Sequence, residues 1–272
     1  MNFISRYKAH QPDEQGIIHY SKEEHSVWKK LFERQMTLLP GRACDEYLQG
    51  LERLNLVASS IPQLSDLNRC LHALTGWRVE PVEALISARD FFELLARRCF
   101  PAATFIRSME ELDYVTEPDI FHELFGHCPM LTNQVYADFI QDYAIYVLSQ
   151  PESEWALLQR LFWFTVEFGL INTKQGLRAY GGGILSSISE TVYSVESDLP
   201  MRVRFDPLVV FRTPYRIDQL QPIYFIIDDY LQLYQCAKSN LEILIQRARA
   251  LGEYPPFFSV DENNPWIHIH AC

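Results

Sequence analysis

Two histidines and one carboxylate are the side chains of this sequence best suited to chemistry. His122 and His127 lie in the apolar stretch T-E-P-D-I-F-H-E-L-F-G-H, and Glu167 follows in the aromatic stretch W-F-T-V-E-F-G. Two imidazoles and one carboxylate that leave part of the coordination sphere open are the ligand set of non-heme iron(II) oxygenases. The pattern therefore indicates oxygen chemistry at a metal rather than a structural metal clip.

The spacing of the two histidines argues against a zinc protease. In the protease pattern H-E-x-x-H the second histidine comes four positions after the first, and here that position is Gly126. Residues five apart on an ideal α-helix point about 140° apart, so we expect Gly126 to end or distort the helix and to swing His127 back toward His122. A zinc hydrolase with Glu123 as its general base stays an alternative that this spacing disfavours.

Glu167 needs a partner, because its neighbours in the sequence are mostly aromatic or apolar. A buried, unpaired carboxylate costs several kcal/mol, and a divalent metal, a proton or a distant arginine would relieve that cost. Trp163 precedes Glu167 by one helical turn and shares its face. Its indole could line a pocket for an aromatic substrate, although ordinary core packing explains the spacing equally well.

Two further groups could bind a substrate. Arg107 can bind a carboxylate through two parallel hydrogen bonds, and Asp119 could hold its guanidinium in place. A surface ion pair is the commoner explanation of such a pair. The run Y-G-G-G-I-L-S-S at 180–187 permits close backbone approach and includes the hydroxyl of Ser186. It is not G-x-G-x-x-G, so it does not indicate a dinucleotide site.

Composition limits the class of protein. The chain has 272 residues, 48% hydrophobic and 13% aromatic, which suits one large domain, or at most two. A net charge of −11 argues against a nucleic-acid surface, which needs clustered Lys and Arg. Neither a signal peptide nor an apolar stretch long enough to cross a bilayer is present. Six cysteines without a C-x-x-C pair indicate free thiols. We therefore expect a cytoplasmic protein that binds neither nucleic acid nor membrane.

Helical periodicity dominates the elements that must position these side chains. We predict helices at 22–35, 43–54, 63–75, 88–98, 119–126, 133–148, 152–171 and 223–251, and short strands at 178–180, 202–205 and 208–211. Ser87 and Asp119 are predicted N-caps, and Gly126 lies where a helix would end. The expected fold class is mostly α with small β elements.

Together, these strings resemble the pterin-dependent aromatic amino acid hydroxylases, in particular the bacterial members that act on phenylalanine. The strings T-E-P-D-x-x-H-E-x-x-G-H, W-F-T-V-E-F-G and Y-G-x-G-x-L-S-S are highly specific in combination. The resemblance covers nearly the whole chain, from Trp28 and L-P-G-R-A-C, through T-G-W and S-A-R-D-F, to Tyr215 and the dipeptide Gln221-Pro222.

The resemblance implies a mostly helical catalytic domain that binds one Fe(II) and a reduced pterin. The pterin would be tetrahydrobiopterin or a related tetrahydropterin, with its ring stacked on an aromatic side chain. The implied iron ligands are His122, His127 and Glu167, and the implied pterin-binding residues are Ile86, Phe91 and Glu123.

For the amino acid substrate, the resemblance implies that Arg107 binds the carboxylate, oriented by Asp119 and assisted by Ser186. Trp163 would line the aromatic pocket, and together with Glu123 it would lie at the reaction. The implied reaction converts L-phenylalanine, O2 and the tetrahydropterin to L-tyrosine and a 4a-hydroxypterin through an Fe(IV)-oxo intermediate.

Two residues favour phenylalanine as the substrate. Trp163 resembles the phenylalanine and tyrosine hydroxylases of the family, and Ile217 stands where tyrosine hydroxylases carry Asp. An apolar residue there suits a ring without a hydroxyl. Tryptophan or tyrosine hydroxylation is the first alternative, and a non-catalytic protein that binds pterin or metal is a more distant one.

We expect one catalytic domain over residues 1–272, with irregular segments at 1–20 and 252–272. The length leaves room for neither the regulatory domain nor the tetramerisation helix of the animal members, so we expect a monomer or a homodimer. The loop at 108–113, S-M-E-E-L-D, is more acidic than in animal members, and we expect it to alter substrate affinity and loop closure.

Overall fold

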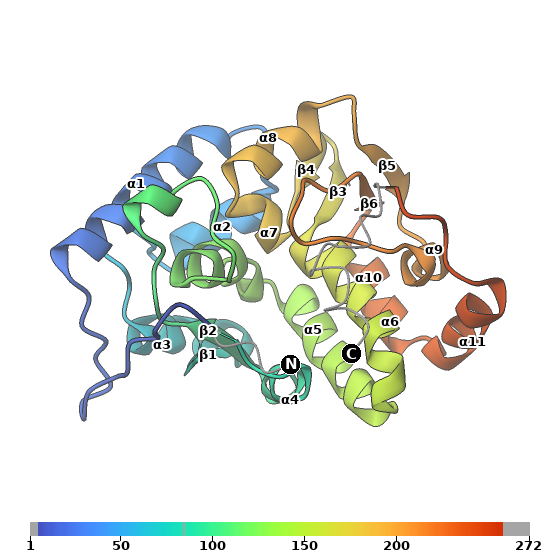
Figure 1. The fold of residues 1–272 in the computed structure, drawn as a ribbon, viewed down its shortest axis with the longest axis horizontal. Coiled ribbons are helices and arrows are strands. Elements are labelled where there is room, and N and C mark those ends of the chain that lie inside the picture. Colours follow the sequence, from blue (N-terminus) through green and yellow to red (C-terminus); the bar gives the residue numbers. More distant parts are fainter. Residues whose placement is uncertain (1–4, 84, 258–272) are drawn as a thin grey trace.

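Helices form most of the described chain, which comprises residues 5–83 and 85–257 of a computed structural model. In chain order (Figure 1) the elements are α1 (Lys22–Leu38), α2 (Asp45–Arg53), α3 (Leu64–Thr75), β1 (Arg78–Val82), α4 (Ala88–Ala96), β2 (Cys99–Ala103), α5 (Gln134–Ser149), α6 (Glu152–Phe162), β3 (Gly169–Thr173), β4 (Gly176–Ala179), α7 (Gly182–Leu185), α8 (Ile188–Glu196), β5 (Met201–Arg204), α9 (Pro207–Arg212), β6 (Ile223–Ile227), α10 (Tyr230–Lys238) and α11 (Leu241–Leu251). Two segments are π-helical, His122–His127 and Trp163–Glu167, and two are short 3₁₀-helices, Met109–Glu111 and Met130–Thr132.

The described strands form two small sheets, which lie next to the segments that carry the predicted site. The larger sheet has the order β4-β3-β6-β5, in which β6 pairs in parallel with both β3 and β5, and β3 pairs antiparallel with β4. β1 and β2 form a separate parallel pair. β3 begins directly after the second π-helix, and every residue of β2 is buried. The sheets therefore fix the chain on both sides of the segments that carry the predicted site.

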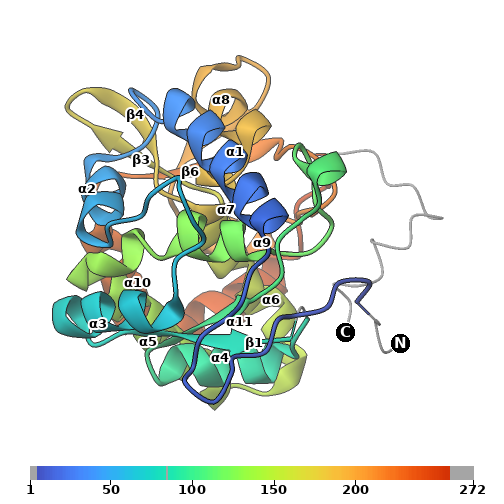
Figure 2. The ribbon, with the colours of Figure 1, turned by 90° about the vertical axis from the view of Figure 1, so that its left-hand side faces the viewer.

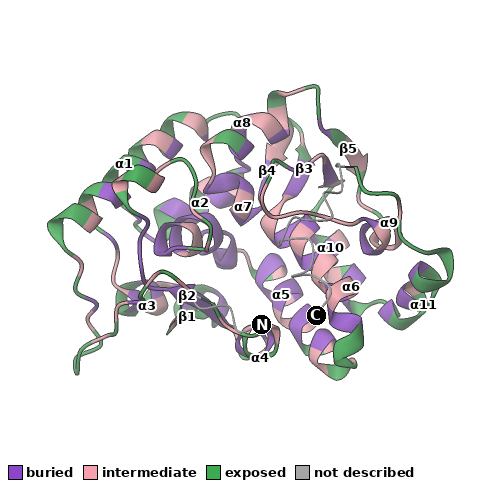
Figure 3. Ribbon diagram, viewed as in Figure 1, coloured by how far each residue is buried: buried purple, intermediate pink, exposed green. Residues whose placement is uncertain are grey.

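The π-helix with the two histidines lies near the middle of the molecule. In Figures 1 and 2, α1, α8 and the four-stranded sheet lie on one side of it, and α3, α4 and the β1–β2 pair lie on the other. Burial follows this arrangement, because in Figure 3 α7 and much of α5 are buried, whereas α11 and the outer side of α1 are largely exposed.

Aromatic packing holds this central π-helix in place. Phe121 and Phe125 stack with 4.7 Å between ring centroids. Phe121 meets Trp28 of α1 edge to face at 5.3 Å, and Phe125 meets Phe32 in the same way at 5.2 Å. The hydroxyl of Tyr47 in α2 donates a hydrogen bond of 2.7 Å to the carbonyl oxygen of Phe125. Each aromatic pair adds about 0.5–1.5 kcal/mol beyond the area it buries, so α1 and α2 rigidify the segment that carries the histidines.

The expected fold class is confirmed, and most predicted elements lie where the sequence placed them. The helices predicted between residues 22 and 98 correspond to α1–α4, the one predicted at 133–148 is α5, and the strands predicted at 178–180 and 202–205 are β4 and β5. The predicted N-caps Ser87 and Asp119 accept hydrogen bonds from the backbone N–H groups of Asp90 and His122. Residues 5–20 and 252–257 contain neither helix nor strand. The rest of the predicted irregular ends, 1–4 and 258–272, lies outside the described residues.

Three predicted elements are wrong. The helix predicted at 152–171 ends at Glu167, and β3 follows it. The first residues of the helix predicted at 223–251 form β6, because a central strand with partners on both sides is as continuously apolar as a buried helix. The strand predicted at 208–211 lies in α9, where Asp206 accepts a hydrogen bond from the N–H of Leu208 and Pro207 occupies the first turn.

The structure bears on two expectations from the sequence, namely that no segment crosses a membrane and that the cysteines are free thiols. Within the described residues, no helix combines the length and the apolar character that a bilayer crossing requires. The thiols that the structure describes are all free, as predicted, and they belong to Cys44, Cys70, Cys99, Cys128 and Cys236.

Candidate metal centre and its two cavities

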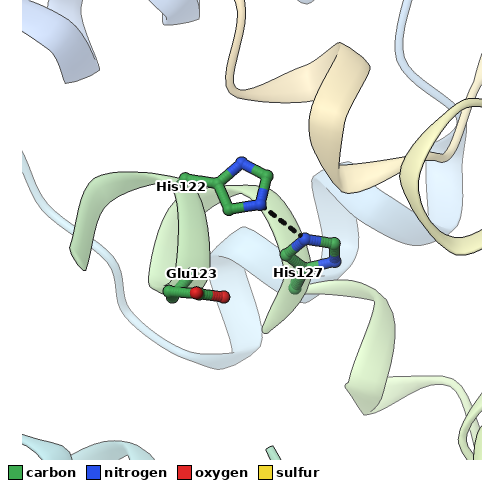
Figure 4. A group of neighbouring side chains, drawn as sticks. All are labelled: His122, Glu123 and His127. Carbon is green, nitrogen blue, oxygen red and sulfur yellow. Dashed lines mark hydrogen bonds between the residues drawn. The ribbon is translucent and has the colours of Figure 1, made fainter. Parts of the chain in front are cut away.

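Three potential ligand groups converge on one point. The Nε2 atoms of His122 and His127 are 3.0 Å apart, as the dashed line in Figure 4 marks. The Glu167 carboxylate lies 3.3 Å from His127 Nε2 through Oε1 and 3.7 Å from His122 Nε2 through Oε2. Two ligands at right angles, each about 2.1 Å from a metal, are about 3.0 Å apart. The three side chains are therefore spaced to share one metal ion on one face of its coordination sphere.

The π-helix explains how histidines five positions apart meet. In a π-helix each backbone N–H bonds to the carbonyl five residues earlier, so residue i+5 lies about one turn above residue i. His122 and His127 are the first and last residues of this segment. The helix does not end at Gly126, because it continues to His127, and Gly126 is not among the glycines with a positive φ. The expected distortion that brings His127 back toward His122 is present as the π-helix itself.

Ser186 fixes the tautomer of His122. A serine hydroxyl has one proton, and Ser186 donates it to the carbonyl oxygen of Gly182 at 2.8 Å. Ser186 Oγ also lies 2.9 Å from His122 Nδ1, so that nitrogen must be the donor in the second bond. His122 is thus protonated on Nδ1 and directs the lone pair of Nε2 at the common point. This is the usual way in which an outer hydrogen bond orients a metal-binding histidine.

The glycine run after β4 makes room for His127. A Cβ atom on Gly182 would lie 2.4 Å from both Cε1 and Nδ1 of the His127 ring. His127 Nδ1 is buried and has no hydrogen-bond partner within the described residues. The ring is consequently held by close packing against the backbone of α7, and only glycine fits at position 182.

Two carboxylates lie near the imidazoles, and their environments differ. A carboxylate oxygen of Glu123 lies within 4.8 Å of nitrogens of both histidines (Figure 4). Burial, with the charges of Glu167 and Asp119, raises the pKa of Glu123 well above its usual value. Burial opposes ionisation of Glu167 too, but both imidazoles and the backbone N–H of Gly183 attract its charge and lower its pKa overall.

His122 is the neutral partner of this group. Burial and the neighbouring His127 lower the pKa of His122 to about 4, so His122 is neutral at neutral pH.

Arg107 and Asp119 form a buried, bidentate ion pair. Arg107 Nε and Nη2 each donate a hydrogen bond of 2.8 Å to the two carboxylate oxygens. Asp119 is fully buried and Arg107 is 6% exposed, so the surface ion pair that the sequence left open is excluded. Asp119 also accepts the backbone N–H of His122 at 3.0 Å. One aspartate therefore orients both the guanidinium and the start of the histidine segment.

Two cavities meet at the converging ligands. The larger, about 460 Å³, is lined by the predicted substrate residues Arg107, Trp163 and Ser186 as well as by His122 and Glu167. The smaller, about 280 Å³, is lined by both predicted apolar pterin residues, Ile86 and Phe91, and again by Trp163 and Glu167. Volumes of this order suit small-molecule ligands. Of the remaining predicted residues, Asp119 lies behind Arg107, and neither cavity includes Glu123 in its lining.

Known proteins are similar to this chain in sequence and in fold. Residues 2–256 match the family of biopterin-dependent aromatic amino acid hydroxylases. The chain belongs to this family. A phenylalanine-4-hydroxylase from Pseudomonas aeruginosa is 54% identical over 254 residues, 93% of this chain and 97% of that protein.

Solved structures agree with this assignment. The phenylalanine hydroxylase of Legionella pneumophila has 67% sequence identity and a TM-score of 0.91, covering 92% of this chain and 100% of that one. The Chromobacterium violaceum enzyme, solved with bound iron(III) and the oxidised cofactor 7,8-dihydrobiopterin, has 43% identity and a TM-score of 0.85, covering 93% of this chain and 91% of that one. The family resemblance, the fold class and the enzyme class inferred from the sequence are confirmed, whereas the roles of individual residues stay predictions.

The acidic loop of this hydroxylase, 108–113, is matched by cations and hydroxyls from distant parts of the chain. Glu111 accepts a hydrogen bond of 2.6 Å from the hydroxyl of Tyr7 and forms an ion pair with Arg6. Asp113, which lines the larger cavity, forms an ion pair with Arg34 of α1. Two of the three acidic side chains of the loop are thus paired with arginines, and these ion pairs tie this wall of the cavity to the N-terminal segment and to α1.

Sequence reasoning missed Glu190, a buried carboxylate at the larger cavity. It is 3% exposed, and its Oε1 accepts hydrogen bonds from the hydroxyl of Tyr224 at 2.6 Å and from the backbone N–H of Gln221 at 3.1 Å. Burial raises the pKa of Glu190 to about 7, although these two bonds partly oppose the rise. No local pattern marks it, because its partners lie more than thirty residues away.

The first prediction concerns the glycine run. Gly182→Ala should displace the His127 ring and weaken metal binding by about tenfold or more, the usual effect of disturbing the groups that hold a ligand. Gly183→Ala is the graded comparison, because its Cβ would meet Glu167 and Phe168 no closer than 3.0 Å. Calorimetric titration of each metal-free variant with cobalt(II) measures the affinity. Unchanged affinity in Gly182→Ala would contradict the proposed packing.

The second prediction concerns pH. Because the folded-state pKa of Glu190, about 7, is above the ordinary value of 4.5 for a glutamate side chain, its protonation stabilises the fold fully below pH 4.5, and this contribution is lost as the pH rises through 7. The loss is on the order of 3 kcal/mol. Glu190→Gln should therefore gain stability over the unmodified protein as the pH is raised from 4.5 to 8.

Urea unfolding of the metal-free proteins at several pH values measures this difference. Glu14→Gln, at an exposed position, is the matched control and should show no such trend. A stability difference between Glu190→Gln and the unmodified protein that does not change with pH would show that Glu190 is ionised throughout.

Proposed function

We propose that this chain is a phenylalanine 4-monooxygenase, which converts L-phenylalanine, O2 and a tetrahydropterin to L-tyrosine and a 4a-hydroxypterin. The observation that carries the proposal is the position of the three converging ligands at the junction of two cavities, one for each organic reactant. The similar proteins from Pseudomonas aeruginosa and Legionella pneumophila bear the name of this activity.

The residues present fit an iron(II) ion held by His122, His127 and Glu167. The oriented Nε2 lone pair, the short distances between the three groups and the partly buried Glu167 carboxylate all favour a divalent cation. Bound iron supplies redox chemistry with O2 that zinc cannot supply. We assign the third position to Glu167 rather than Glu123, because its carboxylate spans both imidazoles and lines both cavities.

The smaller cavity suits the pterin. Phe91 can stack on a flat heterocycle, and Ile86 adds an apolar contact beside it. Phe91 is itself held edge to face by Phe92 and Phe162, at 5.4 and 5.2 Å. Glu123, beside both imidazoles, is assigned to the pterin side of the metal. The 7,8-dihydrobiopterin of the Chromobacterium violaceum structure supports a biopterin-type cofactor.

The larger cavity suits phenylalanine. Arg107 uses Nε and Nη2 for Asp119, so Nη1 remains to bind the carboxylate of an amino acid. The Trp163 indole offers an apolar wall for the ring, and Ile217 in the same cavity offers no partner for a ring hydroxyl. Ser186 has already donated its proton, so we assign it to orienting His122 rather than to direct carboxylate binding.

We further propose one catalytic domain over residues 1–272 that acts in the cytoplasm as a monomer or homodimer. The family match over 2–256 supports a single domain, and the free thiols fit a reducing compartment. The net charge of −11 supports the absence of a nucleic-acid partner.

The direct test is an assay of the purified protein. Iron(II)-loaded protein with phenylalanine, tetrahydrobiopterin and O2 should form tyrosine, measured by chromatography. Zinc-loaded protein should form none, because zinc has no accessible redox change, and His122→Ala should lose the activity with its metal ligand. Formation of another hydroxylated amino acid in preference to tyrosine would refute the proposed substrate, and equal activity with zinc would refute the redox mechanism.

A further inference from the structure

Gln221 occupies a buried position directly behind the Trp163 wall of the two cavities. It lies just before β6, is 1% exposed, and has no assigned role in the reaction described above. Its side-chain oxygen accepts a hydrogen bond of 3.0 Å from the indole N–H of Trp163. Its side-chain nitrogen donates to the carbonyl oxygens of Arg216 and Gln219, at 2.8 and 3.1 Å. The amide is therefore used at both ends.

The hydrogen bond to Gln221 settles the orientation of the Trp163 indole. The indole stacks on Tyr215 with 4.4 Å between centroids and 17° between planes, and it contacts Phe168 at 4.6 Å. Stacking fixes the plane of a ring but lets it slide or turn within that plane. A hydrogen bond from one edge removes that freedom. The face that Trp163 presents to both cavities therefore depends on the Gln221 oxygen.

The other end of the Gln221 amide holds a second wall of the larger cavity. The residues that line the cavity here, 217–220, lie between or beside the two carbonyl groups that Gln221 binds. One side chain thus sets the position of the indole relative to this segment. The separation of these two walls defines the space that an aromatic ring can occupy.

The backbone of Gln221 is anchored in turn. Its N–H donates to Glu190 Oε1, which also accepts the hydroxyl of Tyr224. Glu190 belongs to α8 and Tyr224 to β6. The backbone of Gln221 is consequently held by a buried carboxylate of α8, which is itself bound to a residue of a central strand.

We propose that Gln221 is a positioning residue that holds Trp163 and the segment 216–219 in register, and thereby aims the substrate ring at the metal. This inference rests on the proposed function. Gln221 touches neither the metal ligands nor the pterin residues in any hydrogen bond of the described chain. Its loss should leave metal binding intact while the ring adopts unproductive orientations.

The test uses Gln221→Met, which keeps the size of the side chain and removes both ends of the amide. The expected result is a decrease of about fivefold to tenfold in kcat/KM for phenylalanine, which corresponds to the loss of the hydrogen bond that orients the indole. Less tyrosine should form per tetrahydropterin oxidised, while the iron content stays unchanged. Gln49→Met, at an exposed position of α2, is the matched control.

A double-mutant cycle shows whether Gln221 acts through Trp163. Trp163→Phe removes the indole N–H, so adding Gln221→Met to it should change kcat/KM much less than Gln221→Met does alone. Full additivity of the two effects would overturn the proposal. So would a Gln221→Met protein whose yield of tyrosine per tetrahydropterin equals that of the unmodified protein.

A second readout needs no activity and separates this inference from the proposed function. In ¹⁵N spectra of the zinc-loaded protein, the indole N–H signal of Trp163 is the one lost in Trp163→Phe. Its exchange with solvent should be slow in the unmodified protein and about tenfold faster or more in Gln221→Met. Unchanged exchange would overturn the positioning role even if tyrosine is formed. Faster exchange in a protein that forms no tyrosine would leave Gln221 holding the indole and would refute only the proposed substrate.

Discussion

The convergence of two imidazoles and one carboxylate on a single buried point is the constraint on which the rest of the structure depends. The Nε2 atoms of His122 and His127 lie 3.0 Å apart beside a partly buried Glu167. A divalent cation bound between them would accept both lone pairs and balance the carboxylate charge. The aromatic packing against α1 and α2, the close approach of α7 and the Ser186 hydrogen bond hold these groups in place, as preorganisation at a metal site requires.

The position of the three ligand groups also separates two cavities from one another. Glu167 and Trp163 come from one π-helix and form part of the wall of both cavities. Reactants in the two cavities would therefore meet at the metal without competing for one space, and each would exclude water from its own side. The proximity that catalysis requires arises from the backbone geometry of two short segments, and the surrounding helices and sheets keep these segments in position.

Much of this could be predicted from residue types and spacing. The ligand set, the Arg107–Asp119 pair and helices α1–α5 have local signals, namely donor chemistry and 3.6-residue periodicity. The π-helices could not be predicted, because that periodicity assumes α-helical hydrogen bonding, so the approach of His127 to His122 was expected but was attributed to Gly126. Glu190 and Gln221 were missed for a different reason: their roles arise from partners 31 and 58 positions away, which no local pattern records.

The central claim, that Glu167 and the two histidines share one iron ion, can be tested directly by anomalous X-ray diffraction at the iron edge on crystals of the iron(II)-loaded protein. The account predicts one strong peak about 2.0–2.2 Å from Nε2 of His122, Nε2 of His127 and a carboxylate oxygen of Glu167. A peak bonded to Glu123 in place of Glu167, or iron located away from both histidines, would contradict it.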